Sequence, residues 1–364
     1  MKQILTLALL LMGLSAQAQT SVMVPSLDDL QDGIHHWNLF HKERHYNRYA
    51  DNDYHHIADN LLAYQNTDGG WMKNIDWLGI LDTDSVKAAL SERNAQSTLD
   101  NSNTFPQIEY LAEVYAITGE TKYRDGALHG IIYLLDTQKD NGGWRGWDVD
   151  AITFNDEVST GCLRLFQRIL QGDKKYQWLD KKTLKRIRTA YDRGIDMVLK
   201  TQYVQNGVKT VWGQQHDNVT LQPCKARSFE LPGLTARESC PVIELLMGIK
   251  DPSPEVVNAV DCAVAWLENN AIHGIRIERI TLPEDKQYNH EYPYDNVVVN
   301  DSTAPRIWAR FYELSDNTPF FCQRWGKKVS TLADVDGERR TGYDWYGYWP
   351  ETVIKHYKEW KKLR

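Results

Sequence analysis

The feature of the sequence that most constrains the fold is a repeat that ends in a glycine and tryptophan corner. QNTDGGW at residues 65–71 recurs as TQKDNGGW at 137–144 and, more loosely, as TQYVQNGVKTVWG at 201–213. WLENNAIHG at 266–274 is a fourth, degenerate candidate. Each interval between copies has room for two helices and their connections. The sequence therefore predicts a chain of helical hairpins.

The segments between the corners support this prediction, because their apolar residues fall at helical spacing. Between the first two copies these residues are Ile108, Leu111, Tyr115, Ile131, Leu134 and Leu135. Pro106 is tolerated in the first turn of a helix, and Gly119 is typical of a helix end. The predicted unit is a helix, a glycine turn, a second helix and a Gly-Gly-Trp corner.

Three or more such hairpins cannot bury their apolar faces alone, so they must stack or close into a ring. We therefore predict a mainly all-α fold, an α/α toroid that forms one domain over residues 19–364. Short β-hairpins are expected near 208–211 and 274–280. The N-termini of the inner helices would carry partial positive charge at one rim of a central cleft, which suits an anionic substrate.

The tryptophans of the corners have a structural and a functional reading. We favour the structural one for Trp71 and Trp144, because glycine supplies left-handed turns and tryptophan seals helix ends. The chain has 13 Trp and 19 Tyr, so other aromatic side chains remain available to stack on sugar rings.

The N-terminus predicts export. Lys2 precedes an apolar run over residues 4–14, and Ala16 and Ala18 form a small-residue cleavage site, which is the pattern of a signal peptide at 1–18. The run is shorter than the roughly 20 residues of a membrane span. We expect a mature protein in the periplasm or outside the cell, without a membrane partner.

The five cysteines form neither a disulfide scaffold nor a zinc motif; they are Cys162, Cys224, Cys240, Cys262 and Cys322.

The charge balance excludes one class of partner. The chain has 42 Lys and Arg against 49 Asp and Glu, a net charge of −7, whereas nucleic-acid binding needs a basic face. An acidic polysaccharide would meet the same repulsion. Such a substrate must be drawn in by local cations and by a bound metal ion.

Two clusters of oxygen-bearing side chains precede predicted helices. Asp100 and Asn101 lie in TLDNSNT, and Asn155, Asp156 and Glu157 lie in ITFNDEV. Carboxylate and amide oxygens are the ligands that calcium prefers, although no D-x-D-x-D-G loop is present. A calcium site would therefore be assembled from separate loops.

Helix capping is the alternative role for these segments. Asp156 would cap the helix that runs to Gly172, and Thr104 would cap the helix that contains Pro106. Local pattern alone favours this structural reading.

A third cluster occupies a long, non-periodic polar stretch at 212–239, and long loops in compact domains are often functional. Its charged or titratable members are His216, Asp217, Lys225, Arg227, Glu230, Arg237 and Glu238. An ordinary account pairs Arg227 with Glu230 and Arg237 with Glu238 as ion pairs. We favour that account for Arg237 more than for Arg227.

Five motifs occur in the order in which they stand in the family 10 polysaccharide lyases that act on pectate, and the chain resembles that family from about residue 65 to 347. The motifs are GGWMKNIDW, TLDNSNT, ITFNDEV, QHDNVTLQPCKARSFE and WARFYELSDNTPFF. The resemblance implies an α/α toroid that cuts polygalacturonate endolytically by β-elimination, with calcium bound between protein carboxylates and a substrate carboxylate. The products would be unsaturated oligogalacturonides.

The resemblance also implies roles for individual residues. Arg227 matches the catalytic arginine, Asp156 a calcium-binding aspartate, and Asp100 a second essential acid near the metal. Glu157 is included as a further metal ligand. Residues expected to contact the substrate are Lys73, Asn101, Lys225 and Arg324.

An arginine base requires special conditions, because its reference pKa of about 12.5 keeps it protonated. At about pH 8.5 the gap of about 4 units would cost roughly 5.5 kcal/mol. Nearby positive charge, including calcium, would lower the pKa of Arg227 and reduce this cost. An alkaline rate optimum is therefore expected.

One departure from the family pattern affects specificity. Where the family commonly has G-R-D-G, this chain has Gln323, Arg324, Trp325 and Gly326, so the arginine stays and its acidic neighbour is lost.

Two other functions remain open: a toroidal glycoside hydrolase that uses Asp100 and Asp156 as its acid and base, and a non-catalytic pectin-binding protein. A monomer is expected, since a closed toroid has no need of a partner.

Overall fold

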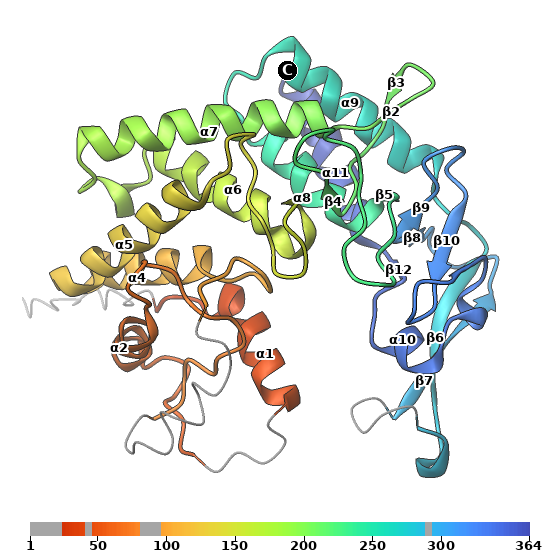
Figure 1. Ribbon diagram of the computed structural model, residues 1–364, viewed down its shortest axis with the longest axis horizontal. Coiled ribbons are helices and arrows are strands. Elements are labelled where there is room, and N and C mark those ends of the chain that lie inside the picture. The colour runs from red at the N-terminus through yellow and green to blue at the C-terminus, as the bar shows by residue number, and fades with distance from the viewer. Residues whose placement is uncertain (1–23, 41–45, 81–95, 288–292) are drawn as a thin grey trace, which may run out of the picture.

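The computed structural model describes residues 24–40, 46–80, 96–287 and 293–364. The predicted signal peptide at 1–18 lies outside this part of the chain. Helices follow one another in an arc from the N-terminus to the middle of the sequence, and the strands of the C-terminal third stand at the end of that arc (Figure 1).

Three helical hairpins form the body of the arc, and the predicted α/α toroid is confirmed. They are α4(Phe105–Thr118) with α5(Thr121–Thr137), α6(Val158–Leu170) with α7(Lys181–Thr201), and α8(Ala236–Met247) with α9(Pro254–Asn269). Helices α4, α6 and α8 contact one another in order, and α5, α7 and α9 do the same in an outer layer. At the two ends α2(Tyr54–Tyr64) packs on α4 and α5, and α11(Trp349–Lys362) packs on α8 and α9.

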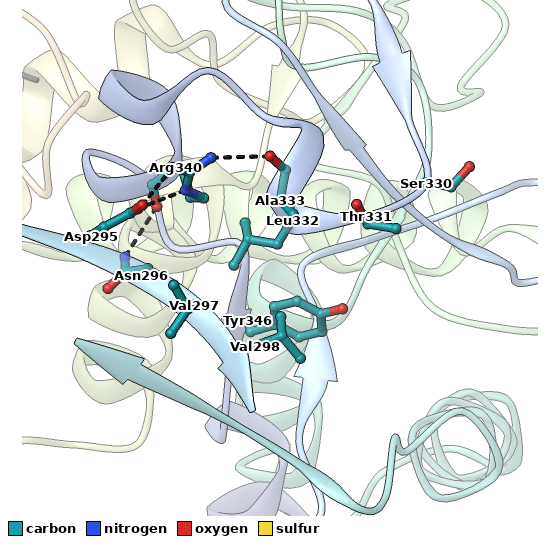
Figure 2. Close-up of a pocket in the computed structure, with 10 residues that line it drawn as sticks. All are labelled: Asp295, Asn296, Val297, Val298, Ser330, Thr331, Leu332, Ala333, Arg340 and Tyr346. Carbon is teal, nitrogen blue, oxygen red and sulfur yellow. Dashed lines mark hydrogen bonds and ion pairs between the residues drawn. The ribbon is translucent and has the colours of Figure 1, made fainter. Parts of the chain in front are cut away.

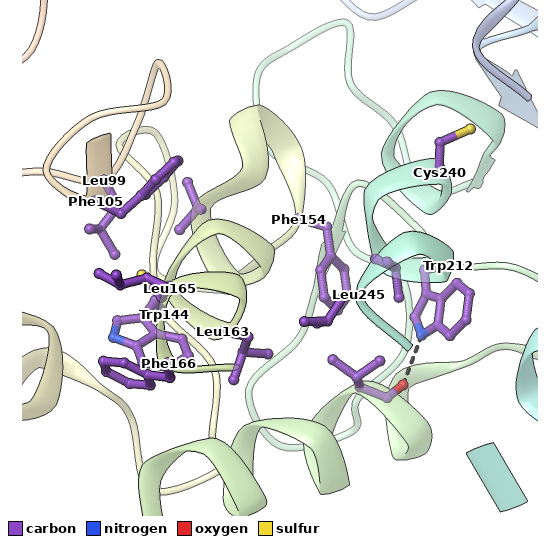
Figure 3. Packing of buried hydrophobic residues seen from close by; sticks show 14 of the residues in the cluster. Leu99, Phe105, Trp144, Phe154, Leu163, Leu165, Phe166, Trp212, Cys240 and Leu245 are labelled. Carbon is purple, nitrogen blue, oxygen red and sulfur yellow. Dashed lines mark hydrogen bonds between the residues drawn. The ribbon is translucent and has the colours of Figure 1, made fainter. Parts of the chain in front are cut away.

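The tryptophan corners tie each turn of the arc to the helix before it. The indole nitrogen of Trp71 donates to the carbonyl of Leu61 at 2.7 Å, and that of Trp144 donates to Leu134 at 2.8 Å. Both side chains are fully buried, so the structural reading of these residues is confirmed. Figure 3 shows the third copy, in which Trp212 donates to the carbonyl of Val198.

The fourth member of the repeat is Trp308, and the prediction of a copy at 266–274 is wrong. The Trp308 indole donates to the carbonyl of Leu267 in α9 at 2.7 Å, which is the same bond to the same kind of helix. Trp266 instead donates to the side chain of Asn317. The sequence hides this copy because Trp308 begins a strand, β8(Trp308–Ala309), with no Gly-Gly before it.

A glutamine in each of the first three copies clamps its corner to the next outer helix. Gln65 donates to the carbonyls of Gly69 and Gly126, and Gln138 donates to those of Gly142 and Ala190. Gln202 makes the same pair of bonds to Thr210 and Ala259. The bonds of Gln138 and Gln202 are buried, and they satisfy polar groups that would otherwise destabilise the core.

The first glycine of each Gly-Gly pair is required by its surroundings. Gly69 and Gly142 both have φ of +94°, and a Cβ at either would lie 2.3–2.4 Å from the carbonyl oxygen of His129 or Arg193 in an outer helix. Only glycine combines this backbone conformation with so close an approach.

A hydroxyl group from the next inner helix holds each tryptophan backbone. Trp71, Trp144 and Trp212 donate their N–H groups to Thr104, Ser159 and Ser239. Thr104 occupies the N-cap of α4 as predicted, yet its side chain makes no capping bond. Its hydroxyl oxygen instead accepts the hydrogen bond from the backbone N–H of Trp71.

Asp156 does not cap α6, so that alternative is wrong. The N-cap of α6 is Glu157, which has no side-chain capping bond.

The strands extend beyond the two predicted hairpins, both of which are present with slightly different bounds. β2(Val204–Gln205) pairs with β3(Val208–Lys209), and β6(Ile275–Thr281) pairs with β7(Tyr294–Asn300) along seven residues. A four-stranded sheet has the order β11(Lys328–Val329), β10(Pro319–Cys322), β9(Phe311–Tyr312) and β5(Leu234–Thr235). Two small pairs join β1(Ile152–Thr153) to β4(Gln215–His216) and β8 to β12(Tyr346–Gly347).

All five cysteines are free. Within the described ranges, no helix combines the length and the apolar character that crossing a membrane requires.

Candidate active site

A cavity of about 520 Å³ lies where the corners and the starts of the inner helices meet. Its lining comes from α1(Gln31–Phe40), from the residues after the first two corners, from the loops before α4 and α6, and from the loop before β5. The lining residues are His36, Lys73, Asn74, Asp100, Asn101, Trp147, Asp148, Asn155, Asp156 and Arg227.

One wall of the cavity carries two carboxylates in different states. Asp100 forms an ion pair with Lys73, whose ammonium also lies 4.6 Å from the centre of the Trp147 ring. Asp156 forms no ion pair in the described part of the chain and accepts a hydrogen bond from Asn155 at 2.8 Å. Burial and then the charge of Asp100 raise the pKa of Asp156 to about 6. The wall therefore holds one neutralised carboxylate and one whose negative charge lacks a partner.

The backbone of this wall is strained. Asn74, Asn101 and Asp156 line the cavity with φ between 50° and 63°, in the left-handed region that few residues other than glycine adopt. Thr104, which is β-branched, has φ of 73°. Such conformations cost on the order of 1–3 kcal/mol each and cluster at functional sites.

The residues of this wall partly fit a hard divalent cation. Asp156 offers a carboxylate without a counter-ion, and Asp100 and the neighbouring asparagines offer further oxygens of the kind that calcium prefers. Among the described residues no group of three His, Cys, Asp or Glu side chains gathers to hold a metal ion. A cation here would need water and an anionic substrate to complete its ligands.

Arg227 also lines the cavity, and the buried carboxylate of Glu230 holds it. Arg227 Nη2 donates to Oε1 of Glu230 at 2.5 Å, and its backbone N–H donates to Oε2 at 3.1 Å, so the expected ion pair is confirmed. Burial alone would lower the pKa of Arg227, but the hydrogen bond and charge of Glu230 outweigh burial and hold that pKa above its usual value. Arg227 Nε lies 3.9 Å from a carboxylate oxygen of Asp148, whose pKa is raised by burial.

A buried arginine links the surroundings of Asp156 with those of Arg227. Arg310, which is 2% exposed, donates to Glu238 at 2.5 Å and to Oδ1 of Asn155, the residue that holds Asp156. Its guanidinium lies 4.1 Å from the centre of the Tyr343 ring, and the Tyr343 hydroxyl donates to Glu230 at 3.0 Å. One packed network thus reaches from the carboxylate wall to the partner of Arg227.

Glu238 is therefore the partner of Arg310, and the expected pair of Arg237 with Glu238 is wrong. Arg237 instead lies 3.5 Å from Asp344.

Three arginines surround Phe229 beyond the cavity. The guanidinium carbons of Arg227, Arg339 and Arg324 lie 4.9, 4.7 and 5.9 Å from the ring centre. Burial and the nearby positive charges lower the pKa of Arg339. The three guanidinium groups gather positive charge around one ring next to the cavity, which suits an anionic chain.

Trp325 follows Arg324 in the chain and has 87% of its surface exposed. It lies in the turn between β10 and β11, where Gly326 N–H donates to the carbonyl of Gln323. Ser228 fixes this turn to the Arg227 loop by donating to the carbonyl of Arg324 at 2.5 Å. Where the family pattern has an acid, this chain therefore presents a flat apolar surface on a firmly held turn.

Of the eight residues to which the resemblance assigns a catalytic, metal-binding or substrate-binding role, the structure brings five together and places three elsewhere. Lys73, Asp100, Asn101, Asp156 and Arg227 line the cavity. Glu157 is not part of the lining and pairs with Arg164 at 2.6 Å. Lys225 and Arg324 are exposed outside it, Arg324 at 3.6 Å from Glu338.

Sequence reasoning missed several residues of the site. His36, Trp147 and Asp148 line the cavity, and Arg310 and Arg339 lie behind or beside Arg227. A hydrogen bond with Asp32 is the main cause of the raised pKa of His36. The position two residues after each corner tryptophan was the available signal, because it holds Lys73 in the first copy and Arg310 in the fourth.

A second cavity of about 550 Å³ lies away from these residues, between β7 and residues 330–333 (Figure 2). Its lining is mostly apolar, with Val297, Leu332 and Tyr346, and the ion pair of Arg340 with Asp295 closes one side. It holds none of the residues predicted to act in catalysis.

Comparisons with known proteins agree with this geometry. The family model described as pectic acid lyase matches residues 65–354. The family 10 polysaccharide lyase from Cellvibrio cellulosa is 29% identical, with 83% of this chain and 91% of that chain covered and a TM-score of 0.69. A mutant of that enzyme in complex with trigalacturonic acid is 28% identical, with 93% and 99% covered and a TM-score of 0.70. No curated protein matches the chain significantly.

Proposed function

The chain belongs to the pectic acid lyase family and is a pectate lyase, and we propose that it cleaves α-1,4-linked polygalacturonate by calcium-assisted β-elimination with Arg227 as the base. The observation that carries the proposal is that Arg227 lines the same cavity as the carboxylates of Asp100 and Asp156. The trigalacturonic acid bound by the related enzyme supports a uronate chain as the substrate.

The residues of the cavity have distinct roles in this proposal. Asp156 and Asp100 would hold calcium, which when bound would neutralise the uronate carboxylate next to the scissile bond and so acidify the proton at C5. Lys73 and Asn101 would orient that sugar. Arg227 would take the C5 proton, and Arg339 and Arg324 would bind carboxylates further along the chain.

The raised pKa of Arg227 sets a condition on this chemistry. With Glu230 at 2.5 Å the guanidinium is protonated at neutral pH, so the fraction able to accept a proton rises with pH. Cations in the cavity would have to lower the pKa of Arg227 for it to act as the base. We expect a rate that increases into the alkaline range. A maximum below pH 6 would contradict the proposed base.

The deciding assay follows unsaturated products in the near ultraviolet, with polygalacturonate and either calcium or a chelator. Arg227→Lys should lower the rate on the order of 1,000-fold, because the ammonium cannot take the place of the planar guanidinium. Arg188→Lys, on the exposed face of α7, is the matched control and should keep the wild-type rate. New reducing ends without unsaturation would favour a glycoside hydrolase, and binding without products would favour a pectin-binding protein.

Calcium binding has a test that does not depend on turnover. Calcium should raise the melting temperature of the wild type, because a ligand that binds only the folded state stabilises it. Asp156→Asn should abolish the shift, whereas Asp192→Asn on the exposed face of α7 should keep it. An equal shift in both variants would remove Asp156 from the metal site.

The same proposal includes export after cleavage near Ala18 and action as a single-domain monomer. The apolar run at 4–14 supports export, and the successive contacts between the helical hairpins support a single domain.

A further inference from the structure

We propose that Glu230 is a positioning residue for Arg227: it fixes which guanidinium nitrogen faces the substrate and stabilises the cation that forms when Arg227 takes the proton. This inference rests on the proposed role of Arg227 as the base. The ion pair of Arg227 with Glu230 then has a role in the reaction as well as in the structure.

The position of the Glu230 carboxylate is fixed from all sides. The side chain is 1% exposed, and Oε1 accepts hydrogen bonds from Arg227 Nη2, Gln214 Nε2 and the Tyr343 hydroxyl at 2.5, 2.9 and 3.0 Å. Oε2 accepts from the backbone N–H of Arg227 at 3.1 Å. Because Tyr343 comes from 113 residues further along the chain, the carboxylate has an anchor that is independent of the Arg227 side chain.

The same contacts leave one nitrogen of Arg227 for the substrate. Nη2 is bound to Glu230, and Nε is buried without a hydrogen-bond partner among the described residues. Nη1 is neither bonded to a described residue nor buried, and the side chain is 38% exposed where Arg227 lines the cavity. Nη1 is thus the nitrogen that a bound sugar can reach.

This arrangement selects the reactive form of the neutral guanidine. Glu230 holds a hydrogen on Nη2, so the lone pair of the neutral form is placed on Nη1, in the way that the aspartate of a catalytic triad fixes the histidine tautomer. The C5–H bond then breaks and its proton forms an N–H bond on Nη1. The electron pair forms the C4–C5 double bond, the C4–O bond breaks, and the leaving oxygen takes a proton from solvent. Glu230 stabilises the guanidinium that results.

The charges around Arg227 make Glu230 the dominant anion. Asp148 lies at 3.9 Å from Nε, and Tyr343 is neutral because burial raises its pKa. Arg339, Arg324 and Arg310 approach from the other elements packed there and favour deprotonation. Removing the charge of Glu230 should therefore change the pH dependence of the rate more than removing that of Asp148.

The test compares the pH profiles of kcat for E230Q, E230D and D148N with that of the wild type, using polygalacturonate and calcium. In E230Q the amide oxygen can still accept the bonds of Gln214, Tyr343 and Nη2 without the negative charge. The pH of half-maximal rate should fall by about one unit or more, and the plateau rate should fall at least about 10-fold. D148N should show a smaller shift in the same direction.

E230D separates charge from placement. It keeps the charge but withdraws the carboxylate by one methylene, so the pH of half-maximal rate should stay near that of the wild type while the plateau falls. E230D also supplies the test if E230Q does not fold. An unchanged or raised midpoint in E230Q, or a wild-type plateau in E230D, would overturn the role of Glu230. The absence of unsaturated product from the wild type would instead refute the proposed function.

Discussion

Lys73 and Arg310 occupy equivalent positions in the first and last copies of the repeat, yet their surroundings differ completely. Each lies two residues after a tryptophan whose indole donates to the carbonyl of an outer helix. Each forms an ion pair, Lys73 with Asp100 and Arg310 with Glu238. Lys73 is 20% exposed and lines the cavity, whereas Arg310 is 2% exposed and lies inside the protein.

The difference is made by what covers each cation. Trp147 borders Lys73 on one side and leaves the cavity open on the other. Tyr343 lies across Arg310, with the ring centre 4.1 Å from the guanidinium. A repeated backbone thus brings a cation to the same place twice, and the covering segment decides whether it meets substrate or supports the site.

The largest effect should come from Arg310→Met. It leaves Glu238 buried without a counter-ion, which typically costs 3–5 kcal/mol, so the free energy of unfolding in urea should fall by about that amount. The double variant R310M/E238L should recover most of the loss. Equal stability of R310M and the wild type would show that Arg310 is not the buried support that the comparison makes it.

Lys73→Met should have the opposite profile. The value of kcat/KM should fall on the order of 100-fold, with KM affected at least as much as kcat, because a binding cation is lost from the cavity. The free energy of unfolding should fall by less than in R310M, since Asp100, although only 6% exposed, lines the cavity instead of the protein interior. Lys200→Met, an exposed cation of α7, should change neither quantity.

The next prediction concerns the pH dependence of stability and the buried His216, which lies four residues after the third corner tryptophan. Burial lowers its pKa from 6.5 to about 4, so between these values the unfolded chain binds a proton that the folded chain does not. Stability should therefore fall as the pH falls through this window, by about 2 kcal/mol at pH 5 relative to pH 8. His216→Gln should remove this component of the urea denaturation curves. A parallel pH dependence in both proteins would place the titration elsewhere.

The smallest effect is expected at the exposed residue Trp325. Trp325→Ala should weaken binding of long oligogalacturonates about 5-fold, or about 1 kcal/mol, because one stacking surface is lost. Cleavage of the shortest substrates should not change. Val219→Ala, at another exposed apolar position, is the control for surface effects. An equal loss on short and long substrates would place Trp325 in the central site.

Local sequence was sufficient for most of the helical frame and for the carboxylate wall. The bounds of the hairpins follow from apolar spacing and from ends such as Gly119, and Asp100 and Asp156 stand in short loops that lead directly into inner helices. These features depend on contacts between residues close in the sequence. The strands after residue 270 were predicted less fully, because most of them pair only two residues and have no periodic pattern of their own.

By itself, the sequence determined that the chain is a ring of helical hairpins with tryptophan corners and that carboxylates gather at its rim. Tertiary structure decided which side chains reach the cavity. Glu157 and Lys225 lie next to site residues in the sequence but outside the cavity. Tyr343, from more than 100 residues beyond Arg227, donates to the partner of Arg227, and Arg310 lies against the Tyr343 ring. The physical reason is that burial and pairing of a charge depend on the segments packed over it, and a local motif carries no record of them.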